Sequence, residues 1–122
     1  MKLSYTALLL SLSVFIMACS PHPASGVWLT ADDNDYDISK VVIGFDGRAN
    51  LISQKLNNTE WHCFWSAVTK QEILLNCTPS TNPENEQRFT VKIDNKKIAE
   101  LLHNDQLVSK LTLQSENPSS PK

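Results

Sequence analysis

The chain has 122 residues, of which 41% are hydrophobic and 20% charged, and its 13 acidic and 11 basic residues give a formal net charge of −2. This length leaves room for one domain. The basic residues are scattered, and no aromatic residues alternate with the adjacent pair Lys96 and Lys97. The composition therefore argues against a nucleic-acid partner.

The first 18 residues are typical of a secretory signal. Lys2 supplies a basic charge, an apolar run extends from Ala7 to Met17, and no acidic residue comes before Asp32. This run is shorter than the roughly 18 to 20 residues that a helix needs to cross a bilayer. We therefore expect residues 1–18 to be removed from the mature protein.

The end of this signal resembles the lipobox of bacterial lipoproteins. Ile16-Met17-Ala18-Cys19 places a small residue before a cysteine, although Met17 stands where that family usually has another small residue. The resemblance implies cleavage before Cys19 and acylation of this cysteine, so that a lipid anchors the protein. Ser20 stands where an Asp would resemble the inner-membrane retention signal, which favours the outer membrane and a domain facing the periplasm. The alternative is an ordinary signal peptidase cutting after Ala18.

Acylation of Cys19 accounts for the odd cysteine among the three in the chain. Cys63 and Cys77 then remain as an even pair in a compartment that permits disulfides. If the two cysteines lie directly opposite each other on a hairpin, Trp65 faces Leu75. A slip of one residue would send the two sulfurs to opposite faces of the sheet, so the disulfide also predicts the register.

Residues 26–114 have the pattern of a β-domain, because apolar residues repeat mostly with a period of two between turn-forming clusters. This pattern predicts an all-β fold, a small antiparallel meander of about seven or eight short strands. The meander would close as a barrel or a sandwich with one disulfide hairpin. Segment 98–102 would also suit one turn of helix. The predicted strands are Gly26–Thr30, Ile38–Phe45, Arg48–Ser53, Glu60–Ala67, Glu72–Thr78, Gln87–Ile93, Lys97–Leu102 and Leu107–Leu113.

The segments on either side of this domain are polar and contain proline. Residues 19–25 are predicted to form a lipidated tether that runs extended. Residues 115–122 have nothing to bury and are predicted to form a disordered tail.

One turn inside the domain has a specific signature. Asp46-Gly47 is typical of a two-residue hairpin turn, because both residues readily take positive φ angles. This turn would pair Phe45 with Arg48 and Val41 with Ile52.

Three tryptophans are the candidate binding residues. Gly26-Val27-Trp28 resembles the start of lipocalin-like barrels, in which the tryptophan plugs one end of the barrel. The alternative for Trp28 is a large aromatic residue that fills the core. We expect Trp61 and Trp65 to pack around the disulfide.

Motifs for catalysis or metal binding are incomplete. Asp33, Asp35 and Asp37 alternate as at the start of a calcium loop, but the twelfth position is Gly44 where a Glu is needed. The three histidines do not have the spacing of zinc ligands. The three glycines do not form a nucleophile elbow. We expect no catalytic residue, no metal and no cofactor, and hence no enzyme.

These features predict a non-catalytic, membrane-anchored lipoprotein that binds another component of the cell envelope in an assembly or accessory role. The expected partners are the membrane, through the lipid on Cys19, and an envelope protein. One alternative is a small carrier of apolar ligands, as the lipocalin-like Gly-x-Trp implies. Another is an inhibitor of a cell-wall hydrolase. Lipoproteins that inhibit lysozyme have a Ser-Gly-x-x-Tyr motif, half of which is present at Ser25 and Gly26, with Leu29 at the tyrosine position.

Overall fold

The computed structural model describes residues 21–53 and 60–119, so the predicted signal, Cys19 and residues 120–122 of the predicted tail lie outside the described residues. The described part of the chain forms eight strands and no helix. In chain order they are β1 (Gly26–Thr30), β2 (Ile38–Ile43), β3 (Arg48–Ser53), β4 (Glu60–Thr69), β5 (Glu72–Pro79), β6 (Gln87–Asn95), β7 (Ile98–His103) and β8 (Gln106–Ser115).

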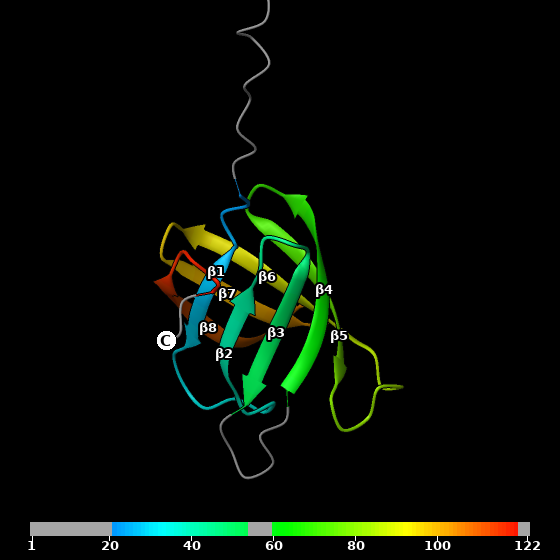
Figure 1. The fold of residues 1–122 in the computed structure, drawn as a ribbon. Helices are drawn as coiled ribbons and strands as arrows, with labels where there is room; N and C mark the ends of the chain where they lie inside the picture. Colours follow the sequence, from blue (N-terminus) through cyan, green and yellow to red (C-terminus); the bar gives the residue numbers. More distant parts are fainter. Residues whose placement is uncertain (1–20, 54–59, 120–122) are drawn as a thin grey trace, which may run out of the picture.

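The eight strands close into an up-and-down barrel (Figure 1). Each strand pairs antiparallel with the next, and β8 returns to pair antiparallel with β1. This arrangement confirms the all-β prediction and decides for a barrel over a sandwich. Segment 98–102 is part of β7, so the helical alternative does not apply there.

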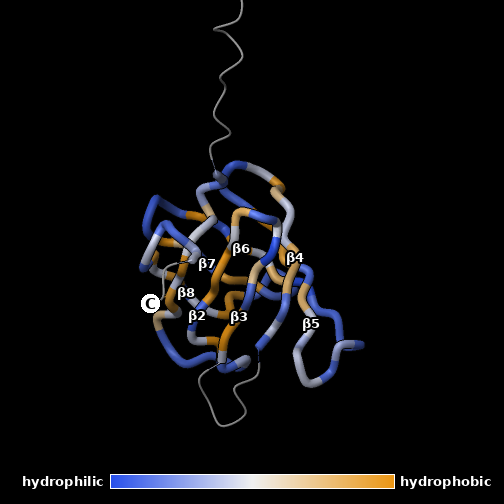
Figure 2. The backbone as a smooth tube through the Cα atoms, in the orientation of Figure 1, coloured by the Kyte–Doolittle hydropathy of each residue, from blue (hydrophilic) through white to orange (hydrophobic). Residues whose placement is uncertain are grey.

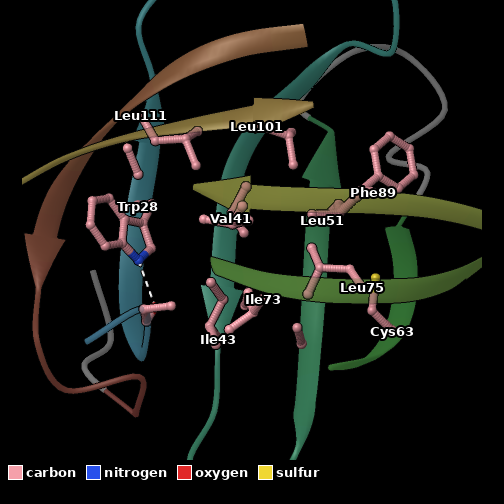
Figure 3. Packing of buried hydrophobic residues seen from close by; sticks show 14 of the residues in the cluster. Trp28, Val41, Ile43, Leu51, Cys63, Ile73, Leu75, Phe89, Leu101 and Leu111 are labelled. Carbon is pink, nitrogen blue, oxygen red and sulfur yellow. Dashed lines mark hydrogen bonds between the residues drawn. The ribbon is translucent and has the colours of Figure 1, made fainter. Parts of the chain in front are cut away.

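Side chains fill the interior of the barrel. Buried residues alternate with more exposed ones along most strands, as in β5, and an eight-stranded barrel is just wide enough for side chains to occupy its interior. The hydrophobic segments lie mainly on the strands and the hydrophilic ones on the connecting loops (Figure 2). The largest fully buried side chains include Trp28, Phe89, Leu51, Ile73, Leu75, Leu101 and Leu111 (Figure 3).

The β2–β3 hairpin differs from the prediction by one residue. Val41 pairs with Leu51 and Ile43 with Ala49, so the predicted pairs of Val41 with Ile52 and of Phe45 with Arg48 are wrong. A two-residue type I′ turn needs positive φ at both central residues. Here Gly47 has a φ of 82° whereas Asp46 is not among the residues with positive φ.

The apolar pattern explains this register. All four residues of the observed pairs, Val41, Leu51, Ile43 and Ala49, are buried. The predicted register would have turned Leu51 and Ala49 to the outer face, because a shift of one residue reverses every side chain of a strand.

The disulfide hairpin has the predicted register. Cys63 lies directly opposite Cys77, and Trp65 lies opposite Leu75. A disulfide joins the two cysteines across β4 and β5, with 4.0 Å between their Cα atoms. The pairing predicted from the number of cysteines is therefore confirmed.

Candidate functional site

The meander places its connections alternately at two ends of the barrel. We call the end where β1 begins the N-terminal end; it holds residues 21–25, the turns at 44–47, 70–71 and 96–97, and residues 116–119. The opposite, distal end holds the loops at 31–37 and 80–86 and the turn at 104–105. In Figure 1 the N-terminal end is at the top.

At the N-terminal end, residues 21–25 pack against the barrel. The Nε2 atom of His22 donates a hydrogen bond of 2.7 Å to the backbone carbonyl of Thr69 at the tip of the β4–β5 hairpin. The amide of Ala24 donates to Nδ1 of His22 at 3.0 Å, which assigns the ring proton to Nε2. Ala24 is fully buried. Residues 21–25, predicted as part of an extended spacer, are thus held at the end of the barrel.

Two of the candidate tryptophans stabilise this end. Trp28 is fully buried, and its Nε1 donates a hydrogen bond of 2.8 Å to the carbonyl of Ala24 (Figure 3). Trp65 lies edge-on to the ring of His22, with 5.7 Å between the centroids. Its Nε1 donates to the carbonyl of Gly44 at 2.9 Å. Both indole N–H groups are satisfied by backbone carbonyls.

At the distal end, Asn34 organises the loop between β1 and β2. Its Oδ1 accepts hydrogen bonds from the amides of Tyr36 and Ile38, at 3.2 and 3.0 Å. Its Nδ2 donates to the carbonyl of Ile38 at 2.7 Å. With this loop held by one side chain, Asp33 and Asp35 remain exposed on its outer side.

Tyr36 points inward from this loop into a cluster of rings. Its ring centroid lies 5.4 Å from that of Phe89 and 6.5 Å from that of Trp61. Its hydroxyl donates to Nδ1 of His103 at 2.6 Å, and Nε2 of His103 donates to Oε1 of Gln87 at 2.9 Å. The cluster Tyr36, Trp61, Phe89 and His103 therefore packs at the distal end, and a chain of hydrogen bonds links Tyr36 through His103 to Gln87.

A hollow of about 260 Å³ lies beside this ring cluster. Its lining combines carboxylates, amides and apolar groups, and Leu107 on its rim is 51% exposed. The described loops of the distal end also carry seven acidic residues and no basic one: Asp32, Asp33, Asp35, Asp37, Glu84, Glu86 and Asp105. The described part of the distal end is thus an acidic surface with an exposed apolar side chain.

The structure separates the residues proposed from the sequence. Trp28 and Trp65 lie at the N-terminal end and Trp61 at the distal end, on either side of the disulfide, so the three do not form one binding site. Cys19 lies outside the described residues. Within the described ranges, no group of three His, Cys, Asp or Glu side chains is placed to hold a metal ion.

No pattern in the sequence predicted that Tyr36, His103 and Gln87 would be joined by hydrogen bonds at the distal end. Tyr36 and His103 are 67 residues apart, and no local pattern connects them. The alternation of Tyr36 with Asp35 and Asp37 is the one available signal, since it sets an aromatic residue within an otherwise polar loop.

No family model, curated protein or solved structure matches this chain. In the part of the chain that the structure describes, no helix has the length and apolar character needed to span a membrane.

Proposed function

We propose that this protein is a non-catalytic lipoprotein, held at the outer membrane by an acyl chain on Cys19, which binds another envelope protein with the distal end of its barrel. The lipobox-like sequence before Cys19 supports the anchor, and Ser20 supports the outer-membrane location. The acidic, ring-supported distal end supports the binding role, because it lies opposite the end where the chain enters the barrel.

The packed interior is the observation that carries this proposal. Trp28, Phe89 and Leu101 occupy the inside of the barrel and have no exposed surface. Binding therefore falls to the outer surface, and this favours a protein partner over the carriage of an apolar ligand, which needs an internal cavity of several hundred Å³.

The chemistry of the distal end indicates the kind of partner. Asp33, Asp35 and Asp105 are exposed around Leu107, so a matching surface carries lysines or arginines around an apolar pocket. Complementary charges accelerate association and select the partner. A lipid anchor adds to this effect, because it confines the barrel to a layer next to the membrane and raises its effective concentration there.

The half motif for inhibition of a cell-wall hydrolase is not accessible on the surface. Ser25 and Gly26, which carry the half motif, are buried at the N-terminal end. Assay of the purified protein against lysozyme separates inhibition from assembly.

Chemical cross-linking in intact cells followed by affinity purification of the full-length protein tests the proposal. We expect one envelope protein to be retained, and the triple variant Asp33→Asn/Asp35→Asn/Leu107→Ser to lose it. Asp94→Asn, a matched exposed acid at the N-terminal end, should retain it. Equal retention by all three proteins, or no acyl chain on Cys19 by mass spectrometry, would overturn the proposal.

A further inference from the structure

We propose that the N-terminal end of the barrel rests directly on the anionic phospholipid surface that holds the lipid of Cys19. In this arrangement Phe45, Val68 and Ile98 reach the boundary between headgroups and acyl chains, while lysines of the neighbouring turns contact the phosphates. This inference rests on the proposed acylation of Cys19 and goes beyond it, because it gives the barrel a fixed orientation on the membrane.

The short distance along the chain is the first argument. Cys19 lies three residues before His22, and three residues span at most about 11 Å when fully extended. His22 is hydrogen bonded to Thr69 at the tip of the β4–β5 hairpin. The headgroup layer of one leaflet is roughly 5 to 8 Å thick. A lipid on Cys19 therefore holds this tip within reach of the headgroups, because the packed residues 21–25 leave little slack.

Exposed hydrophobic side chains are the second argument. Phe45 in the β2–β3 turn is 58% exposed, Val68 near the end of β4 is 56% exposed, and Ile98 at the start of β7 is 41% exposed. The meander brings all three to the N-terminal end, whereas Leu29 and Leu107 lie towards the distal end and Phe64, 68% exposed, lies within β4. Exposed apolar groups that gather at one end of a domain mark a surface for a membrane or another apolar partner, and the nearby anchor selects the membrane.

The charges of the two ends are the third argument. Lys70, Lys96 and Lys97 are exposed in two turns of the N-terminal end. The same end also carries Arg48 and the acidic residues Asp46, Asp94 and Glu116, beside the ion pair of Lys92 with Glu72, so its described residues have a small positive balance. The distal loops that the structure describes, in contrast, carry the seven acidic residues named above. An anionic surface thus attracts the lysines and repels the distal end.

A photo-cross-linking experiment on the full-length acylated protein in vesicles tests this orientation. A benzophenone amino acid replaces Phe45 in one variant and Leu107 in another. Leu107 is the matched control, since it is 51% exposed and lies at the distal end. In vesicles of phosphatidylethanolamine and phosphatidylglycerol we expect lipid adducts at position 45 and several-fold fewer at position 107. Equal yields at the two positions would overturn the inference.

A second arm tests the lysines. The variant Lys70→Gln/Lys96→Gln/Lys97→Gln should lower the adduct yield at position 45 several-fold in the anionic vesicles, whereas Lys40→Gln, near the distal start of β2, should not. An unchanged yield in the triple variant would contradict the role of the lysines.

The mass of the same protein separates the two proposals. Acylated, vesicle-bound protein without adducts at position 45 refutes the orientation alone and leaves the lipoprotein function standing. Protein without an acyl chain on Cys19 refutes both.

Discussion

The two ends of this barrel are closed in different ways. At the N-terminal end, backbone segments lie close together, and side chains of Trp28, Trp65 and His22 hydrogen bond to backbone carbonyls. At the distal end, the side chains of Tyr36 and His103 hydrogen bond to each other and both contact the ring of Phe89, Tyr36 edge-on. The difference shows that side chains close the N-terminal end by bonding to the backbone, whereas the distal end is closed mainly by contacts between side chains.

Replacement of Trp28 is expected to have the largest effect on stability. Trp28→Ala should lower the free energy of unfolding by about 3–5 kcal/mol, because it leaves a cavity in the core and removes the cover of the N-terminal end. Urea denaturation measures this loss. Trp61→Ala, at the partly exposed tryptophan of the distal end, should cost clearly less, and equal losses would contradict the contrast between the ends.

Removal of the disulfide should have the next largest effect. Cys63→Ala/Cys77→Ala should cost about 3 kcal/mol, because the bond closes a loop in the unfolded chain, across a separation of 14 residues. Denaturation with and without dithiothreitol checks the value. Since the bond lies between Trp61 and Trp65, we expect hydrogen exchange to increase at both ends of β4. If hydrogen exchange increased at only one end of β4, the disulfide would not stabilise both ends of the barrel.

Two glycines at the N-terminal end provide a matched pair. Gly26 has a φ of 137°, and a methyl group there would overlap the carbonyl oxygen of Ser115 in β8. Gly47 has a φ of 82° with nothing within 4 Å of an added methyl. Each change to Ala should cost about 1–3 kcal/mol because of the backbone conformation. Gly26→Ala should fall at the upper end of this range, and the reverse order in thermal unfolding would disprove the close approach of β1 and β8.

The hydroxyl of Tyr36 should have the smallest effect. Tyr36→Phe removes the hydrogen bond to His103 and should cost about 0.5–1.5 kcal/mol. A double-mutant cycle with His103→Ala measures the coupling between the two side chains. The same change should loosen the loop at 31–37 in hydrogen exchange and leave the N-terminal end unchanged. Additive effects of the two substitutions would show that the distal ring cluster does not act as a unit.

Local features of the sequence determined where the strands lie. The alternation of Phe89, Val91 and Ile93 is a pattern of neighbouring residues, and β6 includes all three. The partner of Cys63 followed from the number of cysteines, and the register of β4 with β5 followed from that pair. These predictions succeeded because each depends on a period of two or on a covalent bond.

Tertiary structure alone decided the register of β2 with β3, the closure of β1 on β8, the packing of residues 21–25 and the placing of Trp61 and Trp65 at opposite ends. Each of these depends on residues far apart in the chain competing for one small interior. In β2 and β3, the need to bury Leu51 and Ala49 outweighed the local preference of Asp46-Gly47 for a two-residue turn, because burial of several apolar side chains is worth more than the choice of one turn type.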